Sequence, residues 1–190
     1  MNRSEINRAY SDAVACFARH HWALPARPKW DITDFGLGDF GRFGLTLVNL
    51  ANEPEYCEKV MFARKGQATP SHCHFRKKED IICRVGALSL ELWPARPGPD
   101  SRLPGAFSAR IDGELADIRT GVRFELPAGS RITIEPGIWH TFWPSDQECI
   151  IGEVSTANDD VADNFFLDPT VGRFPEIEED EPAAVRLLRD

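Results

Sequence analysis

His72 and His74 are separated by one residue and could bind a metal ion together. In a β-strand, residues i and i+2 point to the same face, so both imidazoles could approach one ion. Cys73 would then point to the opposite face and is not expected to be a ligand. Glu79 follows five residues after His74, which is enough chain for a turn that brings its carboxylate to the same ion.

A fourth candidate ligand is His140, which follows the turn-forming pair Pro136-Gly137. A turn there reverses the chain, as a strand from the opposite part of a barrel requires to reach the same centre. Three neutral imidazoles and one carboxylate leave open positions on a six-coordinate metal, where substrate oxygens could bind. The remaining histidines, His20 and His21, lack this context and are expected to be ordinary core or surface side chains.

The elements that must position these residues are short, β-rich segments punctuated by glycine and proline. Ala87–Trp93 is the clearest, because Leu88, Leu90 and Leu92 alternate with the residues of the other face. The other expected strands include Leu45–Leu50, Glu58–Ala63, Arg131–Glu135 and Cys149–Val154, and Pro94–Gly105 is expected to be a loop. Short strands separated by turn signals predict an all-β sandwich or barrel.

The N-terminal region has a different, helical pattern. Residues 4–21 predict an amphipathic helix that Ser4 caps and that ends before Pro25. The expected buried face consists of Ile6, Tyr10, Val14, Phe17 and His21. We therefore predict a single domain over residues 1–190, with a helical extension at about 4–24, a barrel at about 35–157 and a C-terminal segment at 158–190. The acidic run Glu176–Glu181 is expected to be a solvated surface segment.

Composition restricts the classes of partner. The chain has 190 residues, 30 of them acidic and 22 basic, for a formal charge of −8. This balance argues against nucleic acid, which requires clustered Lys and Arg. No apolar run approaches the ~20 residues that cross a bilayer, and no signal-peptide core is apparent, so a cytoplasmic protein that does not bind membranes is expected. The five cysteines form no CxxC pair and are expected to be buried thiols.

Two stretches resemble the conserved motifs of cupins. Gly66-x5-His72-x-His74-x4-Glu79-x6-Gly86 resembles the first cupin motif. Gly129-x6-Pro136-Gly137-x2-His140 resembles the second, with one-residue departures around the Pro-Gly pair and Pro144 where many cupins have Asn. The resemblance implies a cupin-type double-stranded β-helix, which is a jelly-roll barrel, with an N-terminal helix. It also implies that His72, His74, Glu79 and His140 are the metal ligands.

A narrower resemblance is to D-lyxose ketol-isomerases. It covers roughly residues 55 to 180 and includes Thr69-Pro70-Ser71-His72-Cys73-His74 and Lys78-Glu79-Asp80-Ile81-Ile82. Its most discriminating part is Gly152-Glu153-Val154-Ser155-Thr156-Ala157-Asn158-Asp159-Asp160, followed by Asp163-Asn164. The resemblance implies a metal-dependent aldose–ketose isomerase acting on D-lyxose and D-xylulose, or also on D-mannose and D-fructose. Two alternatives stay open: another cupin enzyme such as an Fe(II) dioxygenase, and a non-catalytic sugar-binding cupin.

The implied reaction moves a proton between C2 and C1 through an enediol, whose charge a metal stabilises. Glu153 is the candidate proton carrier, because it ends an apolar strand on the same face as Ile151. Lys59 is a candidate for polarising the carbonyl or binding a sugar oxygen. Asp163 is a candidate for binding hydroxyls. The alternatives are exposed side chains at Glu153 and Lys59, and a turn or cap role at Asp163.

The remaining expectations concern the sugar, the metal and the assembly. Arg173 is a weaker candidate for substrate contact. Candidate apolar walls for the sugar are Trp139, Phe142, Trp143, Phe165 and Phe166, although aromatics at this density are usually core. The ligand set suits Mn(II), Fe(II), Co(II) or Ni(II), with Zn(II) less suited because it prefers fewer ligands. The family resemblance favours Mn(II), and a homodimer is expected.

Overall fold

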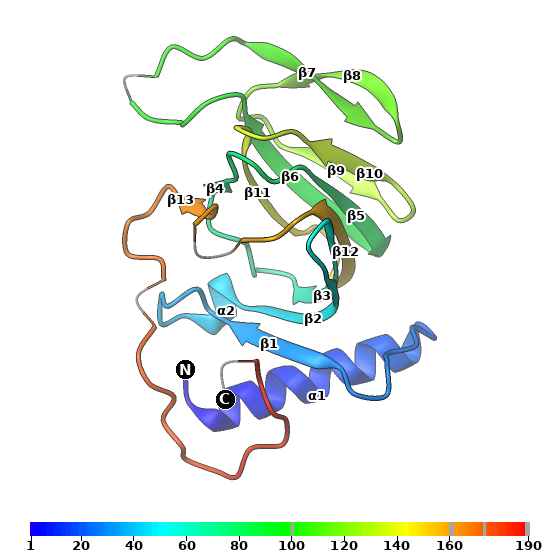
Figure 1. The fold of residues 1–190 in the computed structure, drawn as a ribbon, viewed down its shortest axis with the longest axis vertical. Helices are drawn as coiled ribbons and strands as arrows, with labels where there is room; N and C mark the ends of the chain where they lie inside the picture. Colours follow the sequence, from blue (N-terminus) through cyan, green and yellow to red (C-terminus); the bar gives the residue numbers. More distant parts are fainter. Residues whose placement is uncertain (100, 160–161, 173, 189–190) are drawn as a thin grey trace.

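Two antiparallel β-sheets form the body of the protein in the computed structural model, which describes the chain apart from residues 100, 160, 161, 173, 189 and 190 (Figure 1). The larger sheet has the order β1 (Lys29–Thr33), β2 (Leu45–Asn52), β3 (Tyr56–Arg64), β12 (Glu148–Thr156), β5 (Glu79–Val85), β10 (Arg131–Ile134), β7 (Ala106–Ile111) and β8 (Glu114–Arg119). The smaller has β13 (Phe165–Phe166), β4 (His72–Cys73), β11 (Trp139–Pro144), β6 (Ala87–Trp93) and β9 (Phe124–Pro127). This architecture confirms the all-β prediction.

The main core lies between the two sheets because each sheet presents one apolar face. Leu88, Leu90 and Leu92 on β6 are fully buried, as their alternation predicts. They belong to one cluster with Met61 and Ile151 of the larger sheet. Packing of the two inner faces fixes the register of the strands, since a one-residue slip would expose every leucine of β6.

The N-terminal helix α1 (Arg3–Arg19) exists as predicted, but its cap differs. Asn2, not Ser4, is the N-cap residue: its side chain accepts a hydrogen bond from the Glu5 N–H, and the Glu5 carboxylate accepts one from the Asn2 N–H. This reciprocal capping box satisfies two N–H groups that the helix itself leaves unpaired. The expected Ser4 cap was therefore wrong by two residues.

The buried face of α1 also differs in part from the prediction. Ile6 and Phe17 are buried as expected, whereas Val14 and His21 are exposed. The small residues Ala9, Ala13 and Cys16 complete the buried face in their place. They allow α1 to pack closely against a second core that includes Trp30 of β1 and Val48 of β2.

Both ends of the predicted barrel extend further than expected. The larger sheet begins with β1 at Lys29, ahead of the boundary predicted near residue 35, and β13 lies beyond residue 157. The helix α2 (Phe40–Phe43) connects β1 to β2. In the described residues, no helix is long and apolar enough to cross a membrane.

The C-terminal segment returns to the N-terminal helix (Figure 1). Its acidic run is exposed, as expected, but makes specific contacts: Glu179 pairs with the buried Arg3 guanidinium at 2.6 Å, and Asp180 accepts from Ser4. Further along, the backbone of Leu187 forms an isolated β-bridge with Trp30, and the Leu187 side chain is buried in the same core as Trp30. The C-terminal segment therefore packs against α1 and β1. The prediction of a solvated surface segment did not include these contacts.

Candidate metal centre and its pocket

The four candidate metal ligands converge at one end of the space between the sheets. His72 on β4 pairs directly with His140 on β11, His74 follows β4, and Glu79 is the first residue of β5. One ligand atom from each residue lies within 4.8 Å of the others. The i, i+2 spacing of His72 and His74 and the turn before His140 thus bring together the side chains that the sequence singled out. Cys73 is buried on the opposite face.

Each of the three histidines is oriented by a backbone carbonyl. The acceptors are Pro70 O at 2.9 Å from His72 Nδ1, Asp163 O at 2.6 Å from His74 Nδ1 and Ile138 O at 3.1 Å from His140 Nδ1. A carbonyl oxygen only accepts, so each Nδ1 carries the hydrogen and each Nε2 presents a lone pair. Hydrogen bonds of this kind fix the tautomer and orientation of metal-binding histidines.

A pair of buried atoms in the cluster requires a cation. Glu79 Oε1 lies 2.9 Å from His140 Nε2 and 3.9 Å from His74 Nε2. Glu79 Oε1 and His140 Nε2 are buried and have no hydrogen-bond partner among the described residues. Two lone pairs in that position repel one another unless a cation lies between them. The residues present therefore fit a divalent metal ion.

The electrostatics of the site keep the ligands in their metal-binding forms. Burial, together with His140 and His74, holds the pKa of His72 well below its ordinary value, and burial also lowers the pKa of His74. Burial would raise the pKa of Glu79, but the Lys77 ammonium holds it well below its ordinary value. Near neutral pH His72 and His74 are thus neutral and Glu79 is a carboxylate, as metal binding requires.

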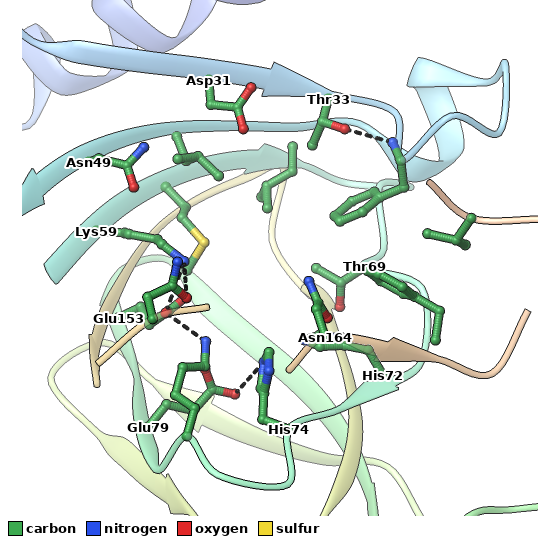
Figure 2. A pocket seen from close by; sticks show the side chains of 18 of the residues that line it. Asp31, Thr33, Asn49, Lys59, Thr69, His72, His74, Glu79, Glu153 and Asn164 are labelled. Atoms are coloured by element: carbon green, nitrogen blue, oxygen red, sulfur yellow. Dashed lines mark hydrogen bonds and ion pairs between the residues drawn. The ribbon is translucent and has the colours of Figure 1, made fainter. Parts of the chain in front are cut away.

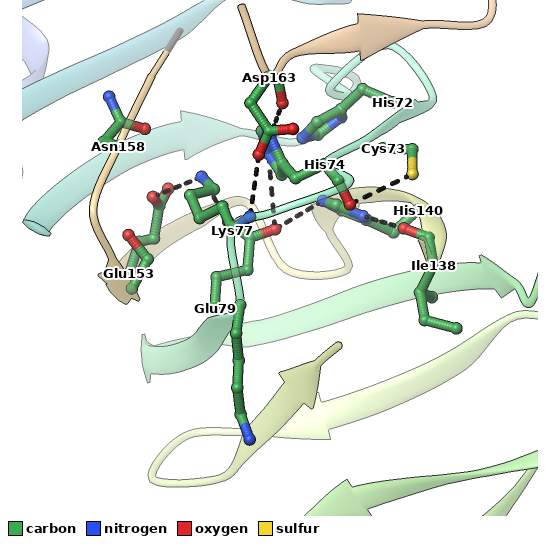
Figure 3. A network of polar contacts seen from close by, with 12 residues as sticks. His72, Cys73, His74, Lys77, Glu79, Ile138, His140, Glu153, Asn158 and Asp163 are labelled. Carbon is green, nitrogen blue, oxygen red and sulfur yellow. Dashed lines mark hydrogen bonds and ion pairs between the residues drawn. The ribbon is translucent and has the colours of Figure 1, made fainter. Parts of the chain in front are cut away.

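Lys77 is a functional residue that the sequence reasoning missed. Its Nζ lies 2.7 Å from Glu79 Oε2 and 3.0 Å from Glu153 Oε1, so one ammonium connects a candidate ligand to the candidate base (Figure 3). The side chain is buried. The available signal was its i, i+2 relationship to Glu79, which on a strand would place both side chains on one face.

Glu153 and Lys59 occupy opposite positions on neighbouring strands, β12 and β3. Lys59 Nζ lies 3.2 Å from Glu153 Oε1, and the two residues are only 8% and 6% exposed. Lys59 also contacts Asn158, which belongs to the discriminating motif. Burial on the inner face excludes the surface alternatives for both side chains, and both line the same cavity as the histidines.

Asp163 has a different position from the one expected. Its carboxylate accepts hydrogen bonds from the N–H groups of Phe75, Arg76 and Lys77, at 2.9 to 3.1 Å. Its carbonyl oxygen orients His74. These contacts hold the loop that carries His74 and Lys77, and Asp163 is not among the residues that line the cavity. They support the turn-capping alternative over the sugar-binding role.

The cluster opens into a cavity of about 560 Å³ (Figure 2). Its wall combines the polar residues above with aromatic and aliphatic side chains. Of the five aromatic candidates, Phe142 and Phe166 line it, whereas Trp139, Trp143 and Phe165 do not. Asn164, whose buried Oδ1 has no partner among the described residues, lies near His72. Arg173 lies outside the described residues.

Comparison with known proteins places the chain among sugar isomerases. The family model described as D-lyxose isomerase matches residues 26–190. The D-lyxose/D-mannose isomerase of Serratia proteamaculans is 43% identical over 164 residues, covering 80% of this chain and 71% of the relative. The D-lyxose/D-mannose isomerase of Thermosediminibacter oceani is 33% identical, covering 94% of this chain and 99% of the relative.

Solved structures share the same fold at lower identity. The L-ribose isomerase of Cellulomonas parahominis with L-ribose has a TM-score of 0.68 and 17% identity, covering 94% of this chain and 98% of that one. The L-ribose isomerase of Acinetobacter sp. DL28 in complex with L-ribose has a TM-score of 0.69 and 17% identity, with the same coverage. At this identity the likeness concerns the fold alone, and it agrees with the predicted all-β architecture.

Proposed function

Because the chain belongs to the D-lyxose isomerase family, we propose that it interconverts D-lyxose and D-xylulose, with D-mannose and D-fructose as a second substrate pair. The reaction is an aldose–ketose isomerisation: a proton leaves C2 of the open-chain aldose and arrives at C1, while the proton of the C2 hydroxyl passes to the oxygen on C1. The observation that carries the proposal is a cation-requiring His/Glu cluster and a buried carboxylate, Glu153, in the wall of one cavity.

His72, His74, Glu79 and His140 would hold the metal. When bound, a divalent ion would supply a Lewis acid for the C1 and C2 oxygens of the sugar. The carbonyl hydrogen bonds to the three imidazoles would keep the ligands fixed, so little reorganisation would accompany substrate binding. We propose Mn(II) as the native ion on the family resemblance, with Fe(II), Co(II), Ni(II) and Zn(II) as the ions to compare.

Glu153 would carry the proton. Its Oε1 accepts hydrogen bonds from Lys59 and Lys77, and no described residue donates to Oε2. That second oxygen is therefore the one available to remove the C2 proton and to return it to C1. The two ammonium groups would orient the carboxylate, and Lys59 would also be placed to donate to a sugar oxygen.

One experiment tests the proposed function directly. The purified protein, loaded separately with each metal, is incubated with a panel of aldopentoses and aldohexoses, and the products are identified by chromatography. We expect D-xylulose from D-lyxose and D-fructose from D-mannose, equally fast with and without O2. Failure to form either ketose would refute the proposal, and strict O2 dependence would favour the dioxygenase alternative.

Two further expectations remain predictions. A homodimer in solution would appear as twice the chain mass of 21.3 kDa in sedimentation analysis. A cytoplasmic location would be tested by fractionation of cells that express the natural protein. Neither expectation is required for the proposed chemistry.

A further inference from the structure

A row of polar side chains crosses the inner face of the larger sheet. Lys29 on β1 is opposite Asn49 on β2, Asn49 is opposite Lys59 on β3, and Lys59 is opposite Glu153 on β12. All four residues line the cavity. We call these four residues the polar row.

The adjacent row of the same sheet is apolar in its central strands. Leu47 on β2 is opposite Met61 on β3, and Met61 is opposite Ile151 on β12; all three belong to the main core. The larger sheet therefore changes from core to polar wall within two residues along each strand. A sheet face that only packed against its partner would have no reason to place an amide and an ammonium here.

Two members of the polar row, Lys29 and Asn49, have no assigned task, and Asn49 is the one that lies next to Lys59. Lys59 donates a hydrogen bond to Glu153, whereas the Asn49 carboxamide makes no hydrogen bond to any described residue. Figure 2 shows Asn49 beside Lys59 at the margin of the cavity, on the side away from His72. A carboxamide offers one acceptor and two donor hydrogens, a combination suited to a hydroxyl group.

The spacing of the strands places Asn49 at the far end of a bound sugar. Adjacent strands lie about 4.8 Å apart, so the Asn49 backbone is ~10 Å from that of Glu153. With C2 beside Glu153, the remaining carbons of a pentose and its terminal oxygen extend over roughly one strand spacing. Both side chains rise from the same face of the sheet, so the remainder would be covered by a hydrogen bond of about 2.9 Å and by a lean of the Asn49 side chain toward the sugar.

The direction in which the carbon chain of the sugar lies in the cavity follows from the chemistry of the cavity walls. An open-chain aldose carries a hydroxyl on each carbon beyond C1. On the side of Asn49 and Lys59 the wall offers a continuous row of hydrogen-bonding groups that ends at Glu153. Elsewhere single polar side chains such as Thr33 and Asn164 lie among Phe35, Phe166 and Phe174. A polyol gains most by lying along the polar row, because its hydroxyls would otherwise lose water without a partner.

We propose that Asn49 binds the terminal hydroxyl of the open-chain aldose and thereby makes the protein recognise the end of the sugar remote from the reacting carbons. The inference rests on the proposed isomerase function and adds a distal subsite to it. Asn49 would be a specificity-determining residue, with no part in the proton transfer.

A cycle of one substitution and one altered substrate tests the subsite. Asn49→Leu keeps a similar volume and matches Leu45 and Leu47 on the same inner face. Both proteins are assayed with D-lyxose and with 5-deoxy-D-lyxose, which lacks the terminal hydroxyl. Comparing the two proteins on each sugar separately cancels differences in ring opening between the sugars. Metal content and circular dichroism establish that the variant is folded, and Asn49→Ala replaces it if it is not.

The expected pattern is a loss confined to the natural sugar. Asn49→Leu should lower kcat/KM for D-lyxose about 3- to 10-fold, the usual worth of one neutral hydrogen bond, and leave 5-deoxy-D-lyxose within about twofold. An equal loss on both sugars, or a wild-type protein indifferent to the missing hydroxyl, would overturn the inference. A wild-type protein inactive on D-lyxose would instead refute the isomerase function itself, and the subsite with it.

Discussion

Glu79 and Glu153 share one ammonium group: Lys77 Nζ lies 2.7 Å from Glu79 Oε2 and 3.0 Å from Glu153 Oε1. Burial lowers the pKa of Lys77, but the two carboxylates more than offset this and raise it above its ordinary value. The lysine therefore stays charged in a buried position. It links the candidate metal ligand to the candidate base and fixes their separation.

Lys77→Met should impair both stability and turnover. The substitution keeps the length of the side chain but leaves Glu79 and Glu153 without their shared cation, and breaking a buried pair typically costs about 3–5 kcal/mol. We expect a lower unfolding midpoint and a kcat/KM reduced about 10- to 100-fold. Lys78→Met is the matched control, because Lys78 is exposed and pairs only at the surface with Glu135. Equal behaviour of the two variants would disprove the role of Lys77.

Asp163→Ala should weaken metal binding without a specific defect in sugar binding. The loop that carries His74 would lose the acceptor of three backbone N–H groups. Metal affinity, measured by competition with a fluorescent chelator, should fall about 10- to 100-fold. The exposed Asp159, which pairs with Arg76, provides the control Asp159→Ala. An increased KM with unchanged metal affinity would instead restore the sugar-binding role.

Gly86→Ala should destabilise the fold more than Gly129→Ala. Both glycines have positive φ, +81° and +97°, so both alanines carry the left-handed cost of about 1–2 kcal/mol. At Gly86 an added Cβ would also lie 2.6 Å from the Glu148 carbonyl oxygen, whereas at Gly129 it meets no described atom within 4 Å. Urea unfolding of the two variants measures the difference. Equal losses would show that the backbone at Gly86 relaxes freely.

Removal of the metal by a chelator should abolish isomerase activity, and the activity recovered afterwards should depend on which metal is added back. EDTA-treated protein is expected to be inactive, and Mn(II) should restore it better than Mg(II), because imidazole ligands disfavour the harder ion. Activity is followed by ketose formation while metal content is measured on the same samples. Full activity in protein shown to be metal-free would refute the metal dependence.

The clustering of the four candidate metal ligands could be predicted from sequence because local rules determine their positions. The i, i+2 spacing orients His72 and His74 alike, and turn residues precede His140. The inner position of Glu153 was predictable in the same way, from strand alternation with Ile151. These features depend on a few neighbouring residues and not on the packing of distant segments.

The missed features depend on contacts between distant parts of the chain. One of the two carboxylates that pair with the buried Lys77 belongs to Glu153, 76 residues away. The carboxylate of Asp163 accepts from N–H groups 86 to 88 residues away. Strand β1 was missed because it has only five residues, and two apolar side chains, Trp30 and Ile32, are too few for their alternation to stand out from the surrounding sequence. Its place is set by pairing with β2 and by α1 packing over Trp30.

The central claim is that Glu153 carries the proton at a separate, intact metal centre. Glu153→Gln preserves the size of the side chain and much of its hydrogen bonding, but the amide cannot act as a base near neutral pH. We predict that the variant retains its full metal content while turnover of D-lyxose falls by ~10²–10⁴-fold, the usual worth of positioned acid–base catalysis. Near-normal turnover in fully metal-loaded Glu153→Gln would contradict the account.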